Sequence, residues 1–277
     1  MKEITGLVKG LEDQAKLVRK EIIRMIAAAQ SGHPGGSLSA TDLLTALYFH
    51  EMKLDPKNPD WEDRDRFILS KGHCCPVVYA CLALRGYYPV DTLLTLRAFE
   101  STLQGHPDMR KTVGLDATTG SLGQGLSLGV GLALAAKLAK KDYFSYVLMG
   151  DGEQNEGQIW EAACTAVKYQ LGNLVGIVDQ NGLQNDGPTD TIMPMESLAY
   201  RWRSFGWQVI EIDGHNMTEI LHALSLAKCN TDKPSMLVCN TIKGKGVSYM
   251  ENVVEWHSGA ISDAQMEQAF ADIERGV

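Results

Sequence analysis

A carboxylate and a carboxamide follow two apolar segments near the middle of the chain. Asp151 lies within Gly150-Asp151-Gly152, and Asn181 comes after 28 further residues, positions 153–180. Carboxylate and amide oxygens are ligands that Mg²⁺ prefers, and the backbone carbonyl of Leu183 could complete the set. Glycine at 152 lets a phosphate group approach the backbone closely. These residue types predict a metal site that holds a diphosphate, although Gly-Asp-Gly alone is also a common turn.

The segments around these residues predict one strand–helix–strand unit. Short apolar runs at 146–149 and 174–178 are typical of strands buried on both faces of a parallel sheet. Residues 156–169 between them have apolar side chains at helical spacing. Because the carboxyl ends of parallel strands share one edge of a sheet, where ligands bind, we expect Asp151 and Asn181 to be neighbours there.

The same patterns predict the elements on either side. A capping residue followed three positions later by an acidic residue or Gln is typical of the start of a helix. The pattern occurs at Ser39 with Asp42, at Asn216 with Glu219 and at Ser262 with Gln265. The segment 123–140 is rich in Gly, Ala and Leu, so we expect a helix packed on most sides. The other predicted elements are a helix at 4–29, a connector at 54–64 and strands at 66–69, 207–212 and 236–238. This alternation predicts a three-layer α/β/α, doubly wound, mostly parallel sheet of five or six strands.

The composition limits the classes of function. The 277 residues, 44% of them hydrophobic, can form one large core, so we expect a single domain over 1–277. The net charge of −8 and the lack of a basic patch argue against nucleic acid or an anionic membrane as a partner. The charged N-terminal segment has no signal-peptide pattern, and no apolar run is long enough to span a membrane, so we expect a cytoplasmic protein. The six cysteines lack metal-binding spacing and are expected to be buried thiols.

Four of the seven histidines lie in loops flanked by Gly or Pro: His33, His73, His106 and His257. Imidazole can donate or accept a proton near neutral pH, so histidines on such loops are candidates for proton transfer. His215 is expected to be a structural turn residue, and His50 and His222 lie in predicted helices.

The order of the motifs resembles the thiamine diphosphate fingerprint and, more narrowly, the transketolase family. The resemblance runs from Ser31 to His257 and rests on seven segments: Ser31 to Gly35, Ser70 to His73, Gly105 to Pro107, Thr118 to Gly125, Gly150 to Asn181, Asp213 to His215, and Trp256-His257. It implies a thiamine diphosphate-binding fold and ketol transfer from a ketose to an aldose.

The resemblance also implies roles for individual residues. His33 and His257 would exchange protons with the substrate, His106 would bind the C1 hydroxyl or stabilise an oxyanion, and His73 would lie near the diphosphate and the donor sugar. Asp151, Asn181 and the Leu183 carbonyl would hold Mg²⁺, with Ca²⁺ or Mn²⁺ as substitutes. The expected cofactor-binding residues are His73, Gly120, Leu122, Gly150, Asp151, Gly152, Glu156, Asn181 and His257. Within that set, the Gly120 backbone would receive the aminopyrimidine, Leu122 would pack beside the thiazolium, and Glu156 would link the two active sites of a dimer.

Complete transketolases are more than twice as long as this chain, and the resemblance ends where their first domain ends. We find no segment for the pyrimidine-binding Glu, the stacking aromatic residues or the groups that hold a sugar phosphate. We therefore expect a split enzyme in which a separate pyrimidine-binding (C-terminal) subunit completes the site, assembled as a heterotetramer. The alternatives are the α subunit of a 2-oxo acid dehydrogenase, a fragment like 1-deoxyxylulose-phosphate synthase, and a non-catalytic binding module. Pentose phosphates are the default substrates, and a sulfonated or deoxy sugar would fit equally well.

Overall fold

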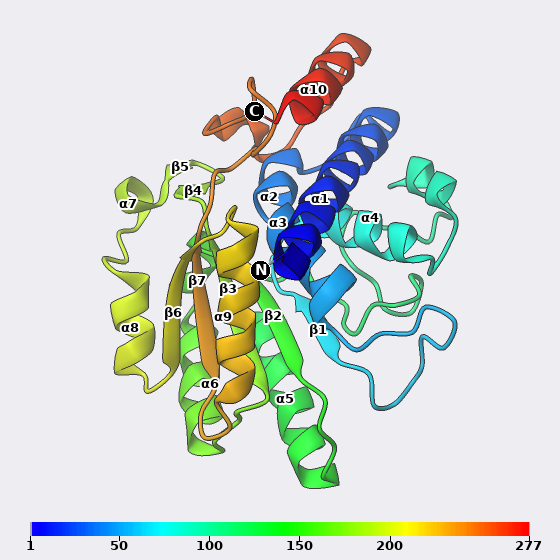
Figure 1. The fold of residues 1–277 in the computed structure, drawn as a ribbon. Coiled ribbons are helices and arrows are strands. Elements are labelled where there is room, and N and C mark those ends of the chain that lie inside the picture. The colour runs from blue at the N-terminus through cyan, green and yellow to red at the C-terminus, as the bar shows by residue number, and fades with distance from the viewer. Residues whose placement is uncertain (1, 277) are drawn as a thin grey trace.

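The computed structural model describes residues 2–276 and contains a parallel five-stranded sheet in the order β1-β2-β3-β7-β6. Every neighbouring pair in this sheet is parallel, which confirms the predicted fold class (Figure 1). A separate antiparallel pair, β4 and β5, follows β3 and was not predicted. The strands are β1 (Arg66–Leu69), β2 (Ser145–Gly150), β3 (Leu174–Gln180), β4 (Leu183–Gln184), β5 (Gly187–Pro188), β6 (Gln208–Asp213) and β7 (Ser235–Asn240).

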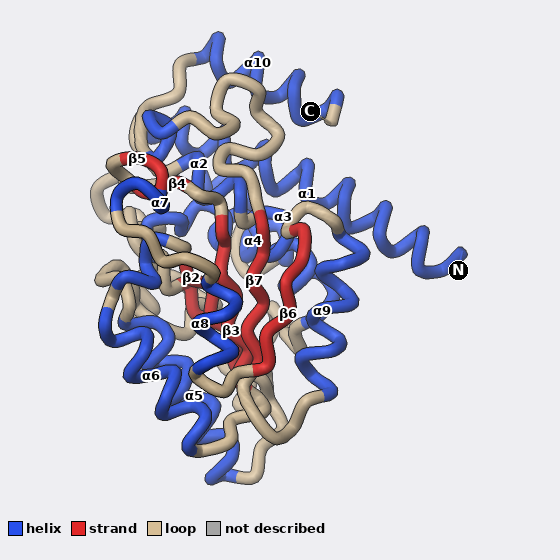
Figure 2. Tube along the Cα trace, turned by 90° about the vertical axis from the view of Figure 1, so that its left-hand side faces the viewer, coloured by secondary structure: helices blue, strands red, loops and turns tan. Residues whose placement is uncertain are grey.

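Helices cover both faces of the sheet, as Figure 2 shows with α5, α6 and α8 on one side and α9 on the other. The helices are α1 (Lys2–Ala29), α2 (Pro34–Ser39), α3 (Thr41–Ala46), α4 (Cys75–Arg85), α5 (Gln124–Ala139), α6 (Gly157–Lys168), α7 (Thr189–Ile192), α8 (Leu198–Ser204), α9 (Met217–Cys229) and α10 (Asp263–Arg275). Short 3₁₀ turns lie at η2 (Gly72–Cys74), η3 (Val90–Thr95), η4 (Gly152–Asn155) and η5 (Val254–His257), and a π-helical turn lies at η1 (Leu47–Glu51).

Successive side chains of the interior strand β2 point to opposite faces of the sheet and pack into two separate cores. Tyr146 and Leu148 pack with α1, α3, α4 and α9 in the larger apolar cluster. Val147 and Met149 pack with α5, α6 and α8 in the smaller cluster. This period of two explains why the strand reads as a continuous apolar run, because both of its faces are buried.

Helix α5 lies very close to the sheet through its glycines. A Cβ at Gly125 would overlap Ser70, and one at Gly129 would overlap Val147. The prediction that this helix is packed on most sides was wrong, because its outer face is open: Leu128 is 43% exposed and Leu138 is 77% exposed. The glycines therefore allow close packing only on the face of α5 that contacts the sheet.

Two further predictions need correction. Ser39 does not begin a helix; Pro34 begins α2, which includes Ser39, and Ala40 is the N-cap of α3. Proline is well suited to the first turn of a helix. The helix that contains Ser39 therefore begins five residues before the position that the capping pattern predicted. The Ser39 hydroxyl is instead buried and donates to the Asp179 carboxylate. The cysteines of the described chain are free, but Cys164 and Cys229 are exposed rather than buried, since their helices turn them outward.

The remaining boundaries agree with the sequence patterns. Helix α1 ends before Gly32, Asn216 caps α9, and Ser262 with Gln265 forms the capping box of α10. Among residues 2–276, no helix combines the length and the apolar character that a bilayer crossing requires.

Candidate active site

Asp151 and Asn181 follow directly after the neighbouring strands β2 and β3, at the carboxyl edge of the sheet. One oxygen of Asp151 accepts a hydrogen bond from the Gly152 amide at 2.7 Å, and the other accepts one from the Gly182 amide at 2.6 Å. The carboxylate therefore joins the loop after β2 to the loop after β3. The structure places the two residues together as the sequence predicted.

The surroundings of Asp151 suit a cation. The residue is 6% exposed, and burial together with the nearby carboxylate of Asp179 raises the pKa of Asp151 to about 6. A bound cation would stabilise the ionised form against both effects. The fit of a metal ion therefore rests on a buried carboxylate that forms no ion pair with any residue of the described chain.

Asn181 and Leu183 supply neutral oxygens beside Asp151. The Asn181 amide nitrogen donates to the Asp179 carboxylate at 3.1 Å, and the Leu183 carbonyl accepts from Lys243 Nζ at 3.1 Å. The described part of the chain has no cluster of three or more His, Cys, Asp or Glu side chains that could bind a metal ion. A metal here would take one carboxylate, one amide oxygen and one carbonyl, which is a set for a hard cation.

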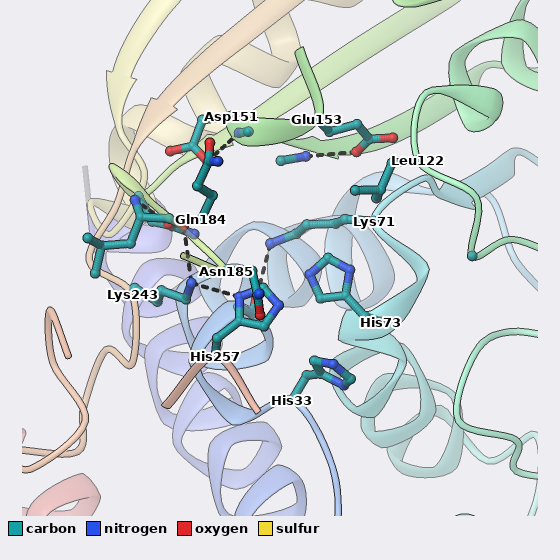
Figure 3. Close-up of a pocket in the computed structure, with 16 residues that line it drawn as sticks. His33, Lys71, His73, Leu122, Asp151, Glu153, Gln184, Asn185, Lys243 and His257 are labelled. Carbon is teal, nitrogen blue, oxygen red and sulfur yellow. Dashed lines mark hydrogen bonds between the residues drawn. The ribbon is translucent and has the colours of Figure 1, made fainter. Parts of the chain in front are cut away.

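Four of the predicted histidines lie close together, and Figure 3 shows three of them, His33, His73 and His257. The ring of His33 lies 5.2 Å from that of His73, 5.5 Å from that of His257 and 6.4 Å from that of His106, between centroids. The rings of His73 and His257 are stacked at 5.2 Å. Loops far apart in the sequence thus bring all four predicted imidazoles together.

These imidazoles are neutral at physiological pH. Burial lowers the pKa of His33 to about 3 and those of His73 and His257 to about 4, and positive neighbours add to the effect. Burial also lowers the pKa of His106, with His73 and Arg97 contributing. A crowded group of imidazoles disfavours any second positive charge.

Two neighbouring cations determine where His33 and His257 carry their single proton. Arg97 lies 3.3 Å from Nδ1 of His33, and Lys243 Nζ lies 3.0 Å from Nδ1 of His257. Guanidinium and ammonium groups only donate, so each Nδ1 accepts and the proton of each ring lies on Nε2. Both histidines therefore have an N–H to offer a ligand.

A cavity of about 330 Å³ contains most of the predicted residues. Its lining is His33, Gly36, Lys71, His73, Gly120, Leu122, Gly150, Asp151, Gly152, Glu153, Asn181, Leu183, Gln184, Asn185, Lys243 and His257. Two predicted residues are not among them. His106 packs against Gly120, where a Cβ would come within 3.3 Å of the imidazole, and Glu156 is an exposed N-cap of α6 beside Gly123.

The sequence reasoning missed three charged residues of the cavity: Lys71, Glu153 and Lys243. All three are 2% exposed. Glu153 accepts from the amides of Gly123 at 2.8 Å and Gly150 at 3.0 Å, and so joins the Gly-rich loop to β2. The available signal was the position of Lys71 two residues after a buried strand, where a solvated lysine is unexpected.

A parallel α/β sheet with hard oxygen ligands at its carboxyl edge and neutral histidines beside them has the architecture of a diphosphate-cofactor domain. The family model of the transketolase thiamine diphosphate binding domain matches residues 12–273, and the chain belongs to the transketolase family.

Relatives of similar length are single subunits of transketolases. The chain is 48% identical over 265 residues to the 6-deoxy-6-sulfo-D-fructose transketolase subunit SqwG of a Clostridium species, covering 96% of each chain. It is 44% identical over 270 residues to one subunit of the apulose-4-phosphate transketolase of Phocaeicola vulgatus, covering 98% of this chain and 96% of that protein. The solved transketolase of Campylobacter jejuni superposes with a TM-score of 0.90 at 34% identity, covering 95% of this chain but only 42% of that one.

Proposed function

We propose that this chain is the diphosphate-binding subunit of a split transketolase, which transfers a ketol unit from a ketose donor to an aldose acceptor. The observation that carries the proposal is the joint placement of Asp151, Asn181 and the neutral histidines around one cavity at the carboxyl edge of the sheet. The 2-oxo acid dehydrogenase and regulatory alternatives are disfavoured, because the relatives of similar length from Clostridium and Phocaeicola are transketolase subunits.

In this proposal, Asp151, the Asn181 amide oxygen and the Leu183 carbonyl would hold Mg²⁺, which would offset the negative charge of the diphosphate of thiamine diphosphate. Gly152 leaves the backbone accessible, and the ammonium of Lys243 adds positive charge beside the Leu183 carbonyl. His73, Gly120 and Leu122 line the same cavity. In this proposal, His73 would lie near the diphosphate, and Gly120 and Leu122 would lie beside the rings of the cofactor.

The bound cofactor supplies the electron sink for breaking a carbon–carbon bond beside a carbonyl. This chain supplies proton carriers around it. His33 and His257 each present Nε2–H, which can donate to a substrate oxygen that gains negative charge. His106 packs against Gly120 and would contact the terminal hydroxyl of the donor. Burial lowers the pKa values of these imidazoles and keeps them neutral, so each ring has one nitrogen that can donate and one that can accept.

We infer that a second chain completes the site and that two copies of each form a heterotetramer. Solved transketolases are more than twice as long, and the domain of this chain spans 42% of the Campylobacter jejuni enzyme. The pyrimidine ring and the sugar phosphate need groups that we assign to that partner. The exposed Glu156 would face a neighbouring copy at the dimer centre. Free cysteines are in keeping with the reducing cytoplasm as the place of action.

The test is ketol transfer by this chain alone and then with the protein encoded next to it, with thiamine diphosphate and Mg²⁺ present. Xylulose 5-phosphate with ribose 5-phosphate is one substrate pair, and 6-deoxy-6-sulfofructose and apulose 4-phosphate are alternative donors because they occur in the names of the relatives. Activity in the mixture only is the expected result. Full activity of this chain alone would contradict the split site, and absence of both activity and cofactor binding from the mixture would contradict the function.

A further inference from the structure

The carboxylate of Asp179 lies directly behind the predicted metal ligand Asn181 and is not part of the cavity lining. It is completely buried at the end of β3. Lys71 forms an ion pair with it, and the hydroxyls of Ser39 and Thr241 each donate to one of its oxygens. A buried charge with this many partners is held in one position.

Asn181 contacts the same carboxylate through its amide nitrogen. Nδ2 of Asn181 lies 3.1 Å from Asp179 Oδ2 and 3.3 Å from Ser39 Oγ. A carboxylate only accepts, so the NH₂ group and not the oxygen of the carboxamide must face it. The hydroxyl of Ser39 gives its proton to Asp179 and therefore also offers a lone pair to Nδ2.

The consequence for the carboxamide is that its oxygen, and not its NH₂ group, is left to face the cavity. Oδ1 of Asn181 accepts from the Leu183 amide at 3.2 Å, beside the Leu183 carbonyl that is a predicted ligand of the same metal ion. A carboxamide turned the other way would present N–H groups to a cation, which cannot bind it. Orientation by an outer partner is a common determinant of metal affinity.

We propose that Asp179, with Ser39 as its auxiliary, is a positioning residue that fixes the Asn181 carboxamide with its oxygen toward the cation of the cofactor site. This inference rests on the proposed function. It assigns a role to Lys71 as well, since a buried carboxylate without this ion pair would be strongly disfavoured.

Two hydroxyl deletions test the proposal with matched chemistry. Ser39→Ala and Thr241→Val each remove one donor to Asp179, but only the Ser39 hydroxyl also contacts Asn181. The measurement is the Mg²⁺ concentration that gives half-maximal binding of thiamine diphosphate to the complex of this chain with its partner, followed by tryptophan fluorescence. We expect Ser39→Ala to raise this half-maximal Mg²⁺ concentration about tenfold and Thr241→Val to change it by less than about twofold. Equal values for the two variants would overturn the inference.

Asn181→Asp gives an independent test. A carboxylate is normally at least as good a ligand for Mg²⁺ as an amide. Here its second oxygen would replace the NH₂ group and face the Asp179 carboxylate, so we expect a higher Mg²⁺ requirement. An unchanged or lower requirement would overturn the inference while leaving the proposed function intact. Failure of the unaltered complex to bind cofactor in a Mg²⁺-dependent manner would overturn the proposed function itself.

Discussion

Nζ of Lys243 lies 3.0 Å from Nδ1 of His257 and 3.1 Å from the carbonyl oxygen of Leu183. One buried cation therefore contacts both a proposed proton-transfer residue and the proposed metal loop. Burial lowers the pKa of Lys243, and an anionic ligand in the cavity would restore it. The same ammonium determines which nitrogen of His257 carries the proton.

We expect Lys243→Met to change the pH dependence of the reconstituted enzyme. After burial, Lys243 is the main cause that lowers the pKa of His257 to about 4. Loss of the positive charge favours protonation of the imidazole, so the acid limb of the kcat/KM profile should move to higher pH. The cofactor requirement should rise by about tenfold or more, because a charged hydrogen-bond donor is lost.

The control for that variant is Lys245→Met, two residues away. Lys245 pairs with Glu251 and does not line the cavity. Its replacement should leave the acid limb where it is. An acid limb that is the same in all three proteins would contradict the assignment of Lys243.

Asp151→Ala should abolish cofactor-dependent ketol transfer by the reconstituted pair. If Asp151 is a metal ligand as proposed, its loss should lower the rate by at least about a hundredfold, the upper end of the effect of losing an outer partner. Asp190→Ala is the control, because Asp190 is an exposed acidic residue of the nearby helix α7. Rates measured at several Mg²⁺ concentrations give the comparison. Near wild-type activity of Asp151→Ala would exclude the metal assignment.

Asp42 should make folding stability depend on acid pH. It accepts from both terminal guanidinium nitrogens of Arg19, at 3.0 and 2.6 Å, and lies 2.7 Å from Nδ1 of His215. Burial alone would raise the pKa of Asp42, but these partners outweigh it and lower the pKa to about 2. A lowered carboxyl pKa stabilises the fold above the unfolded value of 3.8, and the effect is lost as pH falls toward 2.

The variant Asp42→Asn tests this dependence. At neutral pH we expect a loss of about 3–5 kcal/mol in the free energy of unfolding, since the variant leaves Arg19 buried without its partner. The difference from wild type should narrow by up to about 2 kcal/mol as pH falls. Urea unfolding at a series of pH values measures it, and parallel stability curves for the two proteins would count against the interpretation.

Helix α5 offers a pair of glycines with opposite expected effects. Gly129→Ala adds a methyl group against Val147 and should lower stability by about 1–3 kcal/mol. Gly131 is exposed and a Cβ there would meet nothing within 4 Å. Gly131→Ala should therefore raise stability by about 0.5–1 kcal/mol. Urea unfolding separates the two, and an equal effect would show that α5 does not lie this close to β2.

Much of the fold could be predicted because its signals are local. The apolar runs of β2 and β3 and the capping box at Ser262 depend on residues next to one another in the sequence. The incorrect helix start at Ser39 had the right local pattern, but Pro34 began a helix earlier and tertiary contact with Asp179 used the hydroxyl. Local patterns cannot show which of two competing partners a side chain will take.

The sequence predicted most residues of the candidate site but not the charged residues that surround them. Asp151 and Asn181 stand out because they follow buried strands, and the four histidines stand out because they lie in segments with Gly or Pro nearby. Lys71 and Lys243 do not stand out in the sequence, because a lysine side chain is usually exposed to solvent. Their roles depend on carboxylates, carbonyls and imidazoles from distant segments, which become neighbours only in the folded sheet.

The glycine face of α5 has a consequence for how this protein could acquire new substrates. Gly125 lies against Ser70, at the start of the loop that carries Lys71 and His73, with no side chain between them. This contact behind the cavity lining has no spare volume, so larger side chains at either position would destabilise the fold before they changed the choice of substrate. Adaptation to a different sugar would have to proceed through the side chains of other loops, such as Gln184 and Asn185, or through exchange of the partner.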